Sequence, residues 1–70
     1  MEATTFELRG EFIELCNLLK LAGIANSGGQ GKLMVSDGIV SVDGVIESRR
    51  TAKIRAGQTV ECLGQSIKVV

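Results

Sequence analysis

The chain has 70 residues, of which 44% are apolar and 23% are charged, and eight basic side chains balance eight acidic ones. This length predicts one domain with a small core, because such a chain buries only about 60% of its unfolded surface. The absence of histidine excludes a Ser-His-Asp triad and histidine metal ligands, and the two distant cysteines form no zinc-binding pair. We therefore expect a binding protein with no cofactor and no metal rather than an enzyme.

No stretch approaches the roughly 18 apolar residues of a membrane span, and the acidic N-terminus lacks the apolar core of a signal peptide. We therefore expect a cytoplasmic monomer with no membrane contact and no small-molecule substrate. Cys16 and Cys62 each lie among apolar neighbours, which favours free buried thiols. A disulfide between them has little support, because nothing in the sequence marks secretion.

A strand and then a helix are predicted first. Residues 4–9 alternate between apolar and polar side chains, a pattern typical of a half-buried strand. Residues 11–22 change to helical spacing, with Glu11 and Glu14 in the first turn and Lys20 in the last, which suits the helix dipole. The expected inner face consists of Phe12, Leu15, Cys16, Leu19 and Ala22. Gly23 is expected to end this helix.

Both ends of a second, shorter helix are marked. Ser27 and Gln30 form the capping pair S-x-x-Q, in which the Ser27 hydroxyl accepts from the Gln30 amide and the Gln30 side chain reaches back to Ser27. Gly31 is expected to let another helix approach closely, and Gly38 to end the helix. The expected inward side chains are Leu33 and Met34, and the outward ones are Lys32 and Ser36.

Two hairpins follow. The Asp-Gly pair at 43–44 is the strongest short signal for a type I′ turn. Residues 48–53 lose the strand pattern, and we interpret them as a loop that Ile54 anchors to the core. A second hairpin is expected over residues 59–69, turning at 63–64, with Val60, Ile67 and Val69 pointing inward. The predicted fold is α+β: an N-terminal strand, a helix-loop-helix and a small, mostly antiparallel sheet of two hairpins.

The charges are segregated along the chain. Residues 1–19 carry four Glu and one Arg, a net −3, whereas residues 20–60 carry six basic and three acidic side chains, a net +3. Four basic residues lie within one seven-residue stretch: Arg49, Arg50, Lys53 and Arg55. Because salt screens charges beyond about 8 Å, a polyanion responds to the local patch more than to the total. This density favours binding of a phosphate backbone over the alternative of a solvated loop.

Three further motifs in the sequence have competing interpretations. The run at 28–32 lacks the first glycine and the Ser or Thr of a Walker A loop, so it is not a nucleotide site. Gly28 and Gly31 have the spacing of the G-x-x-G loop of a KH domain, which remains an alternative to the capping pair. The carboxylate pairs Glu11/Glu14 and Asp37/Asp43 have no predicted cleft around them, so no catalysis is assigned.

The spacing over residues 18–58 resembles the RNA-binding domain named after the fourth protein of the small ribosomal subunit, also called the alpha-L motif. The residues that carry the resemblance are Leu18-Leu19-Lys20, Gly23-Ile24, Ser27, Gly31, Met34-Val35, Gly38, Val40-Ser41-Val42-Asp43-Gly44 and Ile54-Arg55-Ala56-Gly57-Gln58. The short chain, its Asp-Gly turn and its ESRR segment resemble the small stand-alone bacterial members, the YbcJ-like proteins.

The resemblance implies that structured RNA, ribosomal or transfer RNA, lies against the second helix and the adjoining hairpin of a ribosome-associated protein. The chain departs from the family at Gly28, where the family has Arg, at Gly31, where it has Ala, and at Asp43, where it has Asn. We therefore expect weaker binding, or a footprint shifted toward the basic stretch. The candidate RNA-binding residues are Lys20, Ser27, Gly28, Gln30, Lys32, Arg49, Arg50, Lys53 and Arg55.

No aromatic residue is expected on this surface, so recognition of backbone and shape is predicted rather than base stacking. The alternative function is a protein-interaction module that uses the same exposed helix on a ribosomal or RNA-processing partner. Binding of that kind would depend less on salt.

Overall fold

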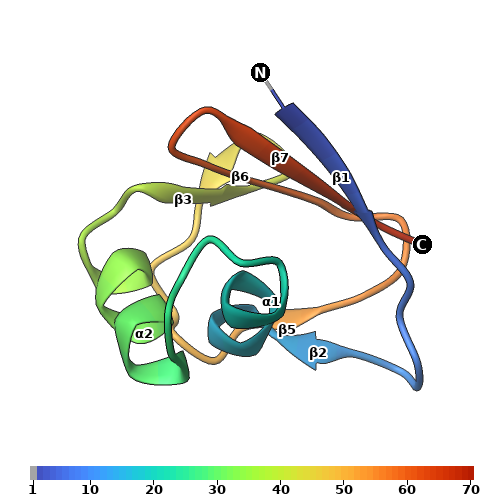
Figure 1. Ribbon diagram of the computed structural model, residues 1–70, viewed down its shortest axis with the longest axis horizontal. Helices are drawn as coiled ribbons and strands as arrows, with labels where there is room; N and C mark the ends of the chain where they lie inside the picture. The colour runs from blue at the N-terminus through green and yellow to red at the C-terminus, as the bar shows by residue number, and fades with distance from the viewer. Residues whose placement is uncertain (1) are drawn as a thin grey trace.

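The computed structural model of the chain describes residues 2–70, and within that range two helices pack beneath a five-stranded sheet (Figure 1). The helices are α1 (Leu15–Leu21) and α2 (Gly28–Ser36), and the strands are β1 (Glu2–Phe6), β2 (Ile13–Glu14), β3 (Val40–Val42), β4 (Val45–Ile46), β5 (Lys53–Ile54), β6 (Thr59–Cys62) and β7 (Gln65–Val69). The large sheet has the strand order β1-β7-β6-β3-β4, and β2 and β5 form a separate two-stranded sheet. The predicted α+β class with two hairpins is confirmed.

The large sheet is antiparallel except at the edge where β1 runs parallel to β7. Both hairpins turn as predicted. Asp43 and Gly44 have φ angles of 52° and 84°, and Leu63 and Gly64 have φ angles of 52° and 77°, the positive values that a type I′ turn requires. The strand predicted over residues 4–9 instead ends at Phe6, because its partner β7 ends at Val69.

One core lies between the two helices and the large sheet. Its buried residues are Leu15, Leu18, Leu19, Ala25, Met34, Val35, Val40, Ala52, Ile54, Val60, Cys62, Ile67 and Val69. The predicted inward positions in β6 and β7 and the anchoring role of Ile54 are thus confirmed. Leu33 is 64% exposed, so its predicted inward position is wrong. The buried face of α2 follows the i, i+3, i+4 rule through Gly31, Met34 and Val35, and Leu33 falls outside it.

The predicted helix over residues 11–22 is wrong at its start. Ile13 and Glu14 form β2, which pairs with Ile54 and Lys53 of β5, and α1 begins only at Leu15. The first turn of α1 therefore holds no acidic residue, whereas Lys20 does lie in its last turn. The segment predicted to be a loop over residues 48–53 contains the start of β5. Its backbone also holds α1 in place, because the Leu15 amide donates to the Ala52 carbonyl at 2.9 Å.

The two helices are in close contact at Gly31. A Cβ atom at this position would lie 2.7 Å from the carbonyl oxygen of Cys16, so only glycine fits without movement of the backbone. The predicted close approach is confirmed. Gly23 ends α1 with a φ of 80°, and the amides of Gly23 and Ile24 donate to the carbonyls of Lys20 and Leu19, as in a Schellman motif.

Candidate nucleic-acid interface

The start of α2 is capped by its own side chains. Ser27 Oγ accepts from the Gln30 amide at 3.1 Å, as predicted. The Gln30 side chain, however, accepts from the amide of Asn26 and not from that of Ser27, so the predicted return bond is displaced by one residue. Ser27 and Gln30 therefore hold the first helical turn with their side chains. Gly28, which is half-buried, lies in the same turn.

A hydrogen bond joins the basic stretch to α2. Arg50 Nε donates to Ser36 Oγ at 2.7 Å, and that hydroxyl donates to the Lys32 carbonyl at 3.0 Å. Lys32 and Arg50 are far apart in the sequence, and this chain of bonds places them on neighbouring parts of one surface. The surface formed by α2, by residues 47–52 between β4 and β5, and by β5 itself is called the basic surface below.

The charge of Arg49 is partly neutralised. Its guanidinium donates to both carboxylate oxygens of Glu47, at 3.0 Å and 3.2 Å, and its backbone amide donates to the same carboxylate at 3.0 Å. These bonds, the side-chain ones first, lower the pKa of Glu47 from 4.5 to about 2. Glu47 is thus ionised at neutral pH, and it reduces the positive potential that Arg49 presents. The density of basic residues in the sequence did not indicate this ion pair.

The β2–β5 pair brings an aromatic ring to the basic surface. Lys53 Nζ lies 4.9 Å from the centroid of the Phe12 ring, and Arg55 Cζ lies 6.0 Å from it. Phe12 is 38% exposed, so its predicted position in the core is wrong. The prediction that no aromatic residue lies on this surface is wrong as well. Both errors have one cause, because the residues before Leu15 join a strand pair and not a helix.

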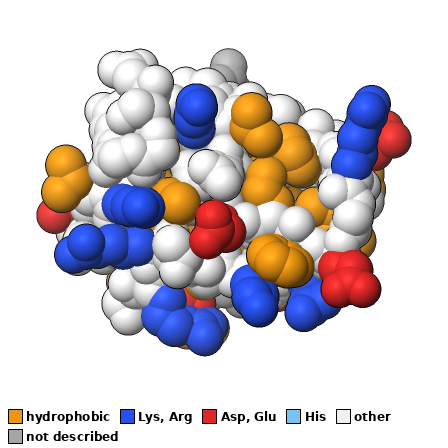
Figure 2. All heavy atoms as spheres, turned by 90° about the horizontal axis from the view of Figure 1, so that it is seen from below, with side chains coloured by type: hydrophobic (Ala, Val, Ile, Leu, Met, Phe, Trp, Pro, Cys, Tyr) orange, Lys and Arg blue, Asp and Glu red, His pale blue; other side chains and the backbone are white. Residues whose placement is uncertain are grey.

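The candidate residues are therefore brought together unevenly. Arg49 and Lys53 line one hollow of about 480 Å³, together with Thr51 and Ala52. Lys53 and Arg55 both lie next to the Phe12 ring. Lys20 is exposed in the last turn of α1, and it belongs neither to the lining of this hollow nor to the residues beside the Phe12 ring. Figure 2 views the molecule from the helix side and shows several Lys and Arg side chains on this face, with fewer Asp and Glu side chains among them.

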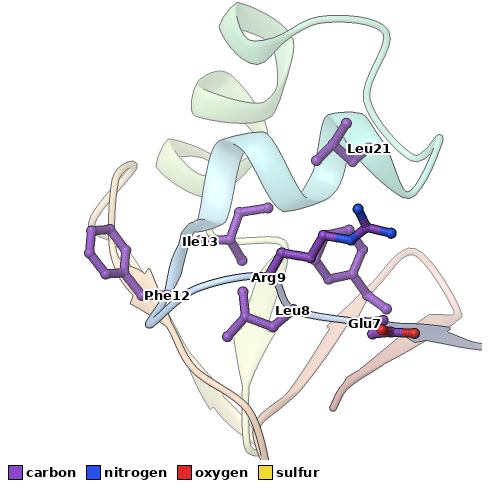
Figure 3. Close-up of a pocket in the computed structure, with 7 residues that line it drawn as sticks. Glu7, Leu8, Arg9, Phe12, Ile13 and Leu21 are labelled. Carbon is purple, nitrogen blue, oxygen red and sulfur yellow. The ribbon is translucent and has the colours of Figure 1, made fainter.

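A second hollow, of about 350 Å³, lies beside α1 and is mainly apolar. It is lined by Phe6, Glu7, Leu8, Arg9, Phe12, Ile13 and Leu21. In Figure 3, Phe12 stands on the side of this group away from Glu7. Phe12 thus lies between an apolar hollow and the cations Lys53 and Arg55.

Among the side chains that the structure describes, no group of three from His, Cys, Asp or Glu is arranged to hold a metal ion. No helix within residues 2–70 has the length and apolarity needed to cross a membrane. Cys16 and Cys62 are free and buried, as predicted, and burial raises the pKa of Cys62.

A helix-loop-helix packed on a small, mostly antiparallel sheet, with cations on α2 and on the segment after β4, defines a domain of the alpha-L type. The chain matches the S4 domain family over residues 6–70. It is 49% identical over 67 residues to the putative RNA-binding protein YbcJ of Escherichia coli (strain K12), which covers 94% of this chain and 96% of that protein. An uncharacterized YbcJ protein of Shigella flexneri matches equally well. The chain therefore belongs to the S4 domain family.

A solved structure agrees with this assignment. The solution structure of YbcJ from E. coli, described as revealing an alpha-L motif involved in RNA binding, matches with a TM-score of 0.74 and 48% identity. The match covers 96% of this chain and 86% of that one. The resemblance that the sequence indicated is thus confirmed for family and fold.

Proposed function

We propose that this protein binds structured RNA, ribosomal or transfer RNA, through the basic surface, as a cytoplasmic monomer that catalyses no reaction. The observation that carries the proposal is the bond from Arg50 to Ser36, which joins the basic stretch to α2. The naming of a relative of 49% identity as a putative RNA-binding protein supports it.

The chemistry of the basic surface suits a phosphate backbone. Arg and Lys side chains on α2, the segment after β4 and β5 are exposed, so they reach phosphates without a large desolvation cost. Arg50 retains the terminal nitrogens of its guanidinium, because its bond to Ser36 uses Nε. Arg50, Lys32 and Lys53 therefore make the main backbone contacts, and Arg49 contributes less because Glu47 shares its charge.

Recognition of structured RNA follows from the size and rigidity of this surface. The domain measures 26 × 25 × 21 Å, so it spans only part of an RNA helix. Lys32 stands on α2 and Lys53 on the β2–β5 strand pair, and Arg50, in the segment between β4 and β5, is tied to α2 by its bond to Ser36. The core holds the helices and the strand pair together. A fixed array of cations selects the phosphate spacing of a folded RNA over that of a flexible strand.

The experiment compares a double variant, Arg50→Ala with Lys53→Ala, and the control Lys68→Ala. Lys68 is an exposed cation on β7, in the large sheet and outside the basic surface. We expect the double variant to weaken RNA binding and to lower the slope of log affinity against log salt by roughly 0.9 for each lost phosphate contact. The control should bind like the wild type. Equal effects of both changes would contradict this placement of the RNA.

Exposed apolar side chains favour a second candidate, a module that binds a ribosomal or RNA-processing protein. Leu33 on α2 is 64% exposed, and Val45 and Ile46 on β4 are 70% and 65% exposed. A protein partner captured through these residues would remain bound after nuclease treatment, and its binding would vary little with salt. Substitution of Leu33 by Ser tests this function, since the RNA proposal predicts little effect.

A further inference from the structure

Phe12 is an aromatic residue that the core does not use. It belongs neither to the buried core nor to the partly buried apolar residues that pack against it. The other aromatic residue, Phe6, does pack against the core. A ring that is 38% exposed in a small domain contributes little to folding at that position, so its surroundings bear on what it contacts.

The strand pair fixes those surroundings. Ile13 pairs with Ile54, which is buried, and Glu14 pairs with Lys53. Side chains alternate along a strand, so Phe12, Lys53 and Arg55 share the face of this pair opposite to the buried Ile54, and Glu14 lies on that face as well. Lys53 Nζ and Arg55 Cζ lie 4.9 Å and 6.0 Å from the ring centroid, within the range of cation–π attraction. The ring therefore lies next to two positive charges, and part of its surface stays exposed.

We propose that Phe12, Lys53 and Arg55 form a stacking site for an unpaired nucleobase of the bound RNA, an inference that rests on the proposed function. The base stacks on the Phe12 ring, and the flanking phosphates of the same nucleotide contact the Lys53 ammonium and the Arg55 guanidinium. Unpaired bases in bulges and loops stack on aromatic rings in this way, and arginine planes add to the stack.

The charges around the ring identify the occupant as a nucleotide. An apolar protein segment would have to desolvate two ammonium or guanidinium groups beside the ring, whereas a nucleotide brings a phosphate to each of them. Lys53 also lines the hollow that Arg49 shares, so a strand that contacts the basic surface is led directly to the ring. The site thus predicts a preference for RNA helices that carry an unpaired nucleotide.

The test uses two RNA duplexes with the same base pairs, one continuous and one with a single bulged nucleotide. The protein variant is Phe12→Leu, which keeps an apolar side chain but removes the aromatic face. We expect the wild type to prefer the bulged duplex about tenfold, within the range found for one stacked base, and the variant to lose this preference. Affinity for the continuous duplex should fall much less than affinity for the bulged duplex.

A second variant gives a direct readout. The chain contains no Trp and no Tyr, so Phe12→Trp introduces a single indole fluorophore on the stacking site. Its emission should be quenched by the bulged duplex and much less by the continuous one. Its spectrum, with circular dichroism of both variants, also verifies that the proteins are folded.

Each result has a distinct meaning. Failure of the wild-type protein to bind either duplex contradicts the proposed function. Binding of both duplexes with equal affinity, unaffected by Phe12→Leu, refutes the stacking site and leaves the proposed function intact. An equal loss of affinity for both duplexes in Phe12→Leu would show that the ring only positions Lys53, which also overturns the stacking site.

Discussion

The ion pair between Glu47 and Arg49 opposes RNA binding on the proposed surface, and Glu47→Gln should therefore increase affinity. The Gln side chain keeps an oxygen that accepts from the Arg49 amide, so the local backbone is retained. A phosphate held by Arg49 would lie about 5 Å from the Glu47 carboxylate, and two unit charges at that distance in water repel by about 0.8 kcal/mol. Removal of the carboxylate should thus strengthen binding about fourfold.

The assay is a titration of structured RNA with wild type, Glu47→Gln and the control Glu61→Gln at several salt concentrations. Glu61 lies in β6, so Glu61→Gln removes the same charge from the large sheet, outside the basic surface. The account predicts a larger gain for Glu47→Gln than for the control, and a gain that fades as salt rises. Equal gains would show that only net charge matters, and a loss for Glu47→Gln would refute the reasoning.

Three further predictions follow from individual contacts. Gly31→Ala should lower the free energy of unfolding by about 1–3 kcal/mol, measured by urea denaturation, because its Cβ would lie 2.7 Å from the Cys16 carbonyl; no loss would contradict the close approach. Gly28→Arg should add about one phosphate contact and so raise both RNA affinity and the slope of log affinity against log salt. The position has room for a side chain, because a Cβ atom there would meet only Asn17 Oδ1, at 3.8 Å. Weaker binding would place the RNA elsewhere. Arg49→Ala should return the pKa of Glu47 from about 2 toward 4.5, as measured by a carboxyl NMR titration. The wild type should have the stability from the ion pair above pH 4.5 and lose it as pH falls through about 2, whereas the variant should lack it. An unmoved pKa would contradict the ion pair.

Elements with local signals were predictable. The second helix and its Ser27 cap depend on neighbouring residues, and both hairpin turns depend on two residues that adopt positive φ. Each of these features is decided within a few positions, so periodicity and turn chemistry are sufficient to find it.

The β2–β5 pair could not be predicted in the same way. Ile13 pairs with Ile54, and neither strand is long enough to show an alternating pattern. Apolar spacing from Phe12 onward fits a helix equally well, so the sequence predicts a helix over residues that in the structure pair with β5. The backbone near Ile13 instead pairs with that of Ile54, far along the chain, and a local pattern does not show such pairing.

Sequence also left the geometry of the site open. Three adjacent apolar residues, Leu33, Met34 and Val35, do not by themselves decide which two face inward. The density of basic residues marks the basic stretch in the sequence but does not indicate which side chains contact it. The contact between Glu47 and Arg49 depends on loop geometry, and it decides how much positive charge the surface presents. The contact between Phe12 and Lys53 depends on strand geometry, and it brings an aromatic ring to the surface.

Binding of the purified wild-type protein to a structured RNA over a range of salt concentrations, with duplex DNA of the same length as the control, tests the central claim most directly. The account predicts RNA binding whose affinity falls steeply with salt, and weaker binding of DNA, because the fixed cations on α2 and β5 match the geometry of folded RNA. Absence of RNA binding at low salt would contradict it and would show that the basic side chains only face solvent.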